Sequence, residues 1–324
     1  MIVDSKQVIF IPKGSTNYIV SYLDKKNYDL NNIDKFIIKM IGYPQNGWID
    51  LKTTKMSKAD FLYKLTTSKA ALKNITLIPG ETYYFFLDEL SNKLKISKEK
   101  LLKYYKQYAY KKDGNILAQT YSLPIGMDEE ELIVYLMDYT DKEYQKYSQK
   151  IFGQYNQKNW FKYITIASII QKEAASIDEM VIVASVIHNR IKENMKLQMD
   201  GTLNYGKYSH TRITPKMIKE DKSTYNTYKT KGLPTDPICA IEFNSIKAAI
   251  FPKNTDYLYF MKAADGKRHI FTNSYKKHKK VIKRVVKAKK QKKQKTKPKK
   301  ASIYKKNKLQ KKRKSLQNIW KNVK

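Results

Sequence analysis

The feature that most restricts the fold of this sequence is a pair of apolar stretches, at positions 164–170 and 180–187, joined by a short polar segment. Both fall well short of the ~18 consecutive apolar residues that a membrane-spanning helix needs, so they are expected to be buried in protein. Ser176 and Glu179 have the spacing of a capping box, which predicts that a helix begins in the polar segment. At about 100° per residue, Glu173 falls within the apolar arc of the preceding helix, in its last turn. The sequence therefore predicts two buried helices, with the Glu173 carboxyl group next to their junction.

A carboxylate on an apolar helix face has two interpretations. In the first, Arg or Lys from another segment neutralises the acid, or the acid lies at the rim of the apolar arc with its head in water. In the second, desolvation raises the pKa of the carboxyl group, which can then donate a proton near neutral pH. The helix taken alone favours the first interpretation, because ion-pair networks also bury acids.

Shorter elements flank this helical pair and predict an α+β fold. The first segment reads as a small alternation of strands and helices, with strands expected at 8–11 and 48–51. Helices are expected after Ser15 or Thr16, at 33–41, after Ser57 with Asp60, at 98–108 and at 128–147. Positions 113–126 contain Gly114, Pro124 and Gly126 and are expected to be mostly loop.

Positive charge is concentrated at the end of the chain. Of the 65 Lys and Arg residues behind the net charge of +36, 24 lie in 275–324, which contains no acid. Such a tail gives salt-dependent affinity for any polyanion, nucleic acid included. Tyr304 and Trp320 are almost its only aromatic residues, however, so nothing in it suggests base readout or a stacking platform. The favoured interpretation is a solvated tail, disordered or helical, that holds loosely to anionic lipid or wall polymer, with no specific nucleic acid expected.

Several kinds of site lack their sequence signals. The four His residues show no metal-ligand spacing, and there is no phosphate-binding glycine loop and no Gly-x-Ser-x-Gly elbow. Neither a metal nor an organic cofactor is therefore expected. Cys239 is the only cysteine, which rules out an intrachain disulfide.

Seven short motifs follow one another in the second half of the chain, at 167–173, 184–190, 196–203, 225–228, 232–238, 256–260 and 266–271. In order and spacing they resemble the endolytic murein transglycosylase family (MltG, YceG-like). The resemblance runs from about Val8 to His278 and is closer in the second half.

The resemblance implies an activity. Family members are peptidoglycan lytic transglycosylases, which cleave the β-1,4 bond between N-acetylmuramic acid and N-acetylglucosamine in nascent glycan strands. They use no water, leave a 1,6-anhydromuramoyl end and thereby terminate strand elongation. Their catalytic glutamate, general acid and then base, matches Glu173 in the motif Lys172-Glu173-Ala174. This match reverses the preference between the two interpretations and favours the proton donor.

The resemblance also implies an organisation. It predicts a LysM-like subdomain at 1–69, a helix-rich α+β catalytic domain at 70–280 and the Lys-rich tail at 281–324. The implied location is the periplasmic face of the inner membrane, with peptidoglycan synthases as candidate partners. The membrane anchor that family members usually carry is not visible in this sequence.

Three residues are candidates for binding the glycan: Gln198, Asn226 and Tyr228. Each has a hydrogen-bonding side chain in a loop-like segment and could hold an N-acetyl or hydroxyl group. The alternative, which is equally favoured for the amides, is that these side chains satisfy turns and loops. Asp200 is a candidate supporting or structural acid, and His188 is expected to be a satisfied histidine near the core.

The motifs depart from the family pattern at three places. Ala174 stands where the family has Thr, Gly201 stands where it has Pro, and 234–238 changes a proline-rich turn. None of these departures removes the acid, although they alter the predicted surroundings of the substrate, and the glycine is expected to loosen its turn. A relative that binds peptidoglycan without cleaving it is therefore the alternative function.

Overall fold

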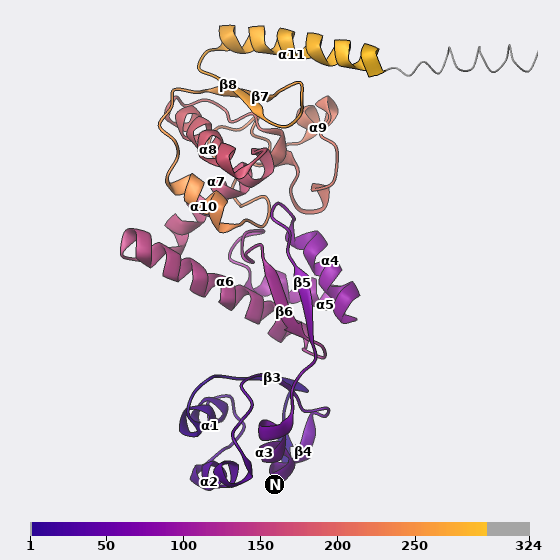
Figure 1. The fold of residues 1–324 in the computed structure, drawn as a ribbon, viewed down its shortest axis with the longest axis vertical. Helices are drawn as coiled ribbons and strands as arrows, with labels where there is room; N and C mark the ends of the chain where they lie inside the picture. Colours follow the sequence, from indigo (N-terminus) through magenta and orange to yellow (C-terminus); the bar gives the residue numbers. More distant parts are fainter. Residues whose placement is uncertain (1, 297–324) are drawn as a thin grey trace, which may run out of the picture. The chain divides into compact units, whose positions relative to one another are not determined.

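The computed structural model describes residues 2–296, which Figure 1 shows coloured along the chain. Helices dominate the described residues, and their strands pair into four antiparallel sheets of two strands each. This mixture of helices with small sheets is an α+β fold. The chain divides into two compact units, one ending at Asn254 and the other beginning at Thr255. The boundaries expected from the sequence, at 69/70 and 280/281, remain predictions.

Residues 2–67 fold around a hydrophobic core of their own. Strand β1 (Ile2–Asp4) pairs with β4 (Lys55–Ser57), and β2 (Val8–Ile11) pairs with β3 (Gly47–Asp50). The same segment contains helices α1 (Thr16–Asp24), α2 (Asn32–Ile41) and α3 (Lys58–Thr67); α3 contacts β1 and β4, and α2 contacts both other helices. Apolar side chains from all three helices and all four strands form the core. The elements predicted here are confirmed; the LysM-like character of this segment remains a prediction.

The middle of the chain adds one sheet and three helices. Strand β5 (Leu72–Thr76) pairs with β6 (Thr120–Pro124), and α4 (Tyr83–Leu94), α5 (Lys98–Tyr108) and α6 (Glu129–Phe152) complete this part. The prediction that 113–126 is mostly loop was wrong at β6. This strand alternates, with Tyr121 and Leu123 buried, but turn residues on both sides obscure so short an alternation.

The two apolar stretches form the predicted helices, α7 (Gln157–Glu173) and α8 (Ile177–Lys192). Every residue at 164–170 is buried, including the polar Thr165 and Ser168, because α8, α10 (Phe243–Ile250) and the 3-10 turn η1 (Asp200–Leu203) all pack on α7. The capping box does not form as predicted. Ser176 is the N-cap of α8 but makes no side-chain cap bond, and the Glu179 carboxylate accepts from Ala175 N instead, at 3.3 Å.

The second unit contains β7 (Tyr259–Lys262), β8 (His269–Thr272) and α11 (Tyr275–Thr296). The two strands pair with each other, and α11 contacts both of them. The beginning of the predicted basic tail is therefore part of a helix, whereas 297–324 lies outside the described residues. Between Ile2 and Thr296, no helix combines the length and the apolar character needed to cross a bilayer.

Candidate active site

Glu173 is the last residue of α7, and its carboxyl group meets the backbone of η1. Glu173 Oε1 accepts a hydrogen bond from Gly201 N at 2.7 Å. The residue keeps some solvent exposure, although protein atoms surround its carboxyl group on most sides. Burial raises the pKa of Glu173 to about 7; the Gly201 N–H opposes this rise, and the negative charge of Asp200 adds to it. Near neutral pH the carboxyl group can therefore carry a proton, unlike an ordinary solvated glutamate.

No cation in the described part of the chain, residues 2–296, neutralises Glu173. Among residues 2–296, no Lys, Arg or His forms an ion pair with Glu173 within 4.0 Å. The neighbouring Lys172 directs its Nζ to Ser209 Oγ, at 2.7 Å. Desolvation without a cation is the environment that keeps a carboxylic acid protonated near neutral pH.

Gly201 makes the close contact with Glu173 possible. A Cβ atom at this position would lie 2.8 Å from Glu173 Oε1 and 2.8 Å from Lys172 Cβ, closer than real Cβ contacts come. Only a residue without a side chain lets the η1 backbone approach the carboxyl group so nearly. Gly201 thus supplies both the space and the N–H donor.

Asp200 and Tyr228 form a second polar pair beside the acid. Tyr228 Oη donates to Asp200 Oδ1 at 2.6 Å. Burial raises the pKa of Tyr228 first, and the bond to Asp200 raises it further, so the phenol stays protonated. Because Asp200 is exposed and Tyr228 half-buried, both side chains can meet a ligand that approaches Glu173.

The segment around Gln198 is held by a buried arginine. Arg190 Nη1 donates to the carbonyl oxygens of Lys196 and Leu197 and to Gln198 Oε1, at 2.8, 2.9 and 3.2 Å. Gln198 itself is exposed and has a left-handed backbone, with φ 53°. Arg190 therefore orients the side chain of Gln198 while leaving it accessible.

Thr227 ties two of the motif segments together. Its Oγ1 accepts from Met199 N at 3.1 Å and lies 3.0 Å from Thr202 Oγ1, and its carbonyl oxygen accepts from Gln198 N at 3.1 Å. These bonds connect 198–202 to the 225–228 loop. The structure therefore brings Glu173, Gln198 and Tyr228 into one region through η1 and this loop.

Asn226 is placed differently. It is fully buried, and its Nδ2 donates to the carbonyl oxygens of Ile218 and Asp221, both at 2.8 Å. Its Oδ1 accepts from Tyr228 N at 3.2 Å. These bonds match the alternative of loop satisfaction, since Asn226 shapes the loop that presents Tyr228.

Sequence reasoning assigned no role to Gly201, Arg190 or Thr227. Arg190 lies in the last turn of the apolar helix and has five N–H donors, so it could have been considered as a residue that holds neighbouring carbonyl groups. Gly201 was noted only as a departure from the family motif. Its contact with Glu173 depends on the packing of η1 against α7, which no local pattern reveals.

Another carboxyl group with a raised pKa, that of Asp113, has a structural role at the start of α4. Burial raises its pKa to about 8, and its two oxygens accept from Tyr83 N and Gly114 N, both at 3.2 Å. Tyr83 is the first residue of α4. The hydroxyl of its N-cap, Thr82, donates to Gly206 O at 2.9 Å and makes no cap bond to the helix, so Asp113 caps α4 from a distance. His188, as expected, is satisfied, with Nε2 2.9 Å from Ala249 O.

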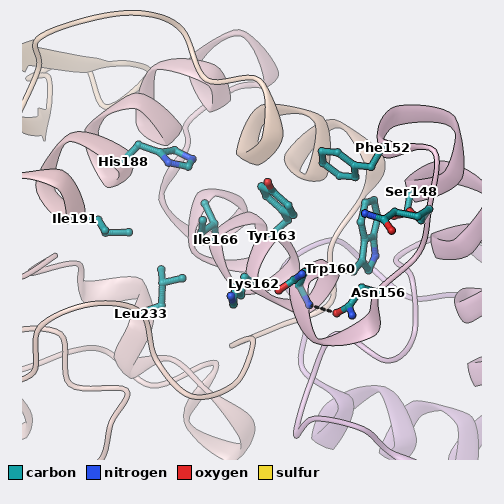
Figure 2. Close-up of a pocket in the computed structure, with 12 residues that line it drawn as sticks. Ser148, Phe152, Asn156, Trp160, Lys162, Tyr163, Ile166, His188, Ile191 and Leu233 are labelled. Carbon is teal, nitrogen blue, oxygen red and sulfur yellow. Dashed lines mark hydrogen bonds between the residues drawn. The ribbon is translucent and has the colours of Figure 1, made fainter.

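A cavity of about 560 Å³ lies along the N-terminal half of α7 (Figure 2). Tyr163 and Ile166 of α7 lie between His188 of α8 and Phe152 of α6, and the rings of Phe152 and Tyr163 are stacked at 5.5 Å. Glu173 does not line this cavity. It is two turns of α7 beyond Ile166, roughly 10 Å along the axis. The candidate site is therefore defined by the contacts of Glu173.

Known proteins resemble this chain over most of its length. The model of the YceG-like family matches residues 9–284. An endolytic murein transglycosylase of Bacillus subtilis (strain 168) is 34% identical over 161 residues, which are 49% of this chain and 44% of that protein. One from Streptococcus pneumoniae serotype 2 (strain D39 / NCTC 7466) is 26% identical over 185 residues, 56% of this chain and 33% of that protein.

The matched part thus spans less than half the length of either relative. A crystal structure of a YceG-like protein from Listeria monocytogenes is also similar, with a TM-score of 0.55 and 26% identity. The similarity covers 86% of this chain and 99% of that one.

Proposed function

Because this chain belongs to the YceG-like family, we propose that it is an endolytic lytic transglycosylase of peptidoglycan. Its substrate is the β-1,4 bond between N-acetylmuramic acid and N-acetylglucosamine in nascent glycan strands, and its product carries a 1,6-anhydromuramoyl end. The observation that carries this proposal is Glu173, a carboxyl group that has no cation partner within residues 2–296 and whose pKa is raised to about 7. The names of the Bacillus and Streptococcus relatives support the reaction class.

The proposed reaction needs one acid. Protonated Glu173 gives its proton to the glycosidic oxygen as the bond from that oxygen to muramoyl C1 breaks. The resulting carboxylate takes the proton of the muramoyl C6 hydroxyl while that oxygen bonds to C1, so the acid ends as it began. The nucleophile belongs to the substrate, and its effective concentration is high without a bound water.

The hydrogen bond from Gly201 assigns different tasks to the two oxygens of Glu173. Oε1 accepts the Gly201 N–H and is thereby favoured as the carbonyl oxygen of the protonated acid. Oε2 is then the oxygen that carries the proton to the glycosidic bond. A second catalytic carboxylate, which glycosidases use for water or covalent capture, is not required.

The surrounding residues take supporting roles in this proposal. Asp200 is close enough for its charge to raise the pKa of Glu173, and a negative charge there also favours the positive charge that develops at C1. Gln198 and Tyr228, both reachable from solvent, are proposed to hold hydroxyl or N-acetyl groups of the glycan. Asn226 is proposed to act on the loop alone.

The alternative is a relative that binds glycan strands without cleaving them, and one substitution separates the two. Glu173→Gln keeps the size of the side chain and its acceptor for Gly201 N, but removes the proton. It should abolish the release of anhydromuropeptides from purified peptidoglycan and leave the circular dichroism spectrum unchanged. Glu193→Gln, an exposed acid at the end of α8, is the matched control and should release products at the parent rate. Unchanged release by Glu173→Gln would end the assignment of this residue.

The cellular setting is proposed from the family resemblance. It comprises the periplasmic face of the inner membrane, termination of strand elongation and contact with peptidoglycan synthases. The basic tail would add attraction to anionic lipid or wall polymer.

A further inference from the structure

Helix α2 (Asn32–Ile41) exposes its apolar side. Ile33, Phe36 and Met40 are 70%, 65% and 73% exposed, and Ile37 and Ile41 beside them are exposed as well. Their spacing of i, i+3, i+4, i+7 and i+8 places all five on one face, about 140° wide. We refer to these five residues as the α2 apolar face. An ordinary surface helix turns such a face toward the core.

This orientation is fixed by polar contacts on the opposite side of the helix. Asp34 is buried, accepts from Asn31 N at 2.7 Å and pairs with Lys58 at 3.0 Å. Asn31 completes the capping box through its side-chain oxygen, and Ile38 is fully buried in the core. Turning the helix to hide its apolar face would break the ion pair and expose Ile38. A contiguous exposed apolar patch held in this way indicates an interaction surface.

The charges around the α2 apolar face select the kind of partner. Asp34 is buried and paired, so the charged side chains of α2 that reach solvent are those of half-buried Lys35 and exposed Lys39 only. Lys13 before α1 is exposed, and so are Lys25 and Lys26 in the loop between α1 and α2. Two exposed acids, Asp24 and Asp29, lie in the same segment, so five lysines against two acids leave it with a net positive charge. The partner should therefore be anionic where it meets the lysines and apolar where it meets the face.

A second copy of the chain fits these requirements poorly. Two copies would bring like charges together in a protein whose net charge is +36. A ten-residue helix is only about 15 Å long and about 10 Å wide. Its face is much smaller than the ~800 Å² that each partner buries in a standard protein interface. An anionic bilayer satisfies both requirements, because acyl chains lie directly beneath negatively charged headgroups.

We propose that α2 docks flat on an anionic lipid bilayer, with the α2 apolar face at the boundary of headgroups and acyl chains and Lys39, on the flank of the helix, among the phosphates. This docking uses residues remote in sequence from Glu173 and does not depend on the proposed cleavage reaction. It also differs from attraction through the basic tail, which needs no apolar contact. Shielding of tail charges by salt should therefore leave part of the binding intact.

A tryptophan placed in the α2 apolar face reports insertion directly. In full-length Phe36→Trp, the fluorescence difference from the parent should move to shorter wavelength with vesicles of phosphatidylglycerol and phosphatidylcholine, and brominated lipid should quench it. Phe251→Trp, at a residue 54% exposed beyond α10, is the matched control and should keep its solvent-exposed emission. Emission from position 36 that stays solvent-like on bound protein would overturn the proposal. So would an equal shift with pure phosphatidylcholine, or one that follows protein concentration without vesicles, which would indicate self-association.

A second variant measures the contribution of the face to affinity. Ile33→Ser, Phe36→Ser and Met40→Ser together alter only exposed side chains, so the fold should be retained. The affinity for vesicles is measured in about 0.5 M salt, which screens the charges of the tail. It should fall at least about tenfold, because burial of even one such side chain contributes more than a tenfold change in affinity. Ile78→Ser, at an exposed isoleucine outside α2, should leave affinity unchanged. Equal affinity of the triple variant and the parent would contradict the proposal.

Discussion

Replacing Glu173 with Gln should stabilise the folded protein, and only at higher pH. Burial raises the pKa of Glu173 from 4.5 to about 7 in the folded chain. Below about pH 4.5 the carboxyl group is protonated whether the chain is folded or unfolded, so Glu173 does not lower the free energy of unfolding. As pH rises toward 7 the unfolded chain ionises first, and the folded protein loses stability. Above pH 7 the loss is complete.

The size of this effect follows from the difference between the two pKa values. At 1.36 kcal/mol for each pKa unit, it amounts to about 3 kcal/mol. The glutamine side chain of the variant would remain neutral at every pH and would still accept the Gly201 N–H. The advantage of Glu173→Gln should therefore grow from near zero at about pH 4 to about 3 kcal/mol at pH 8.

Urea unfolding followed by the fluorescence of Trp48 and Trp160 measures this difference at each pH. The exposed Glu193 is the matched control, and Glu193→Gln should change stability by less than about 0.5 kcal/mol throughout. A difference in the free energy of unfolding between Glu173→Gln and the parent that is constant with pH would refute the inference that Glu173 is a desolvated acid. A variant less stable than the parent at pH 8 would refute it as well.

Three further predictions follow from the contacts of the site. Gly201→Ala places a methyl group 2.8 Å from Glu173 Oε1. The rate of glycan cleavage should therefore fall by about 10- to 100-fold while the fold is retained. Rates like those of the parent in a peptidoglycan release assay would contradict this prediction. Asn226→Ala removes two buried donors and an acceptor, so it should lower the free energy of unfolding by about 2–4 kcal/mol. Urea unfolding measures this loss, and a value under about 1 kcal/mol would contradict the prediction. Removing 297–324, which carries much of the positive charge, should leave cleavage of purified peptidoglycan intact and sharply weaken binding to heparin; loss of cleavage would make the tail part of the site.

Local patterns predicted most of the elements around the site. The apolar stretches, the junction at Ser176 and the position of Glu173 at the end of its helix all follow from periodicity and helix-start signals. Strand β6 could not be found in the same way, because five residues between turn signals acquire their structure from pairing with β5. The burial of Thr165 and Ser168 could not be predicted for a similar reason, because it depends on helices that are distant in the sequence.

The environment of Glu173 was only partly predictable. The apolar arc left a raised pKa as one of two interpretations, and the family resemblance favoured it. The contact with Gly201 depends on how η1 packs against α7. The hydrogen bond from Gly201 N therefore could not be read from the sequence around either residue.

Side-chain type also failed to separate ligand contacts from structural ones. Gln198 and Asn226 both read as candidate amides in loops, yet Gln198 is exposed and Asn226 is fully buried. The difference arises because carbonyl groups of Ile218 and Asp221 surround Asn226. Such partners are set by the path of the loop, which the sequence does not specify locally.

The reaction itself is tested most directly by digesting purified peptidoglycan in water labelled with oxygen-18 and measuring the masses of the products. A single acid, Glu173, that transfers a proton to and from the substrate without water predicts 1,6-anhydromuramoyl ends free of the label. It also predicts that Glu173→Gln releases none of these products. Reducing ends that carry oxygen-18 would show that water attacks C1, and would contradict the account.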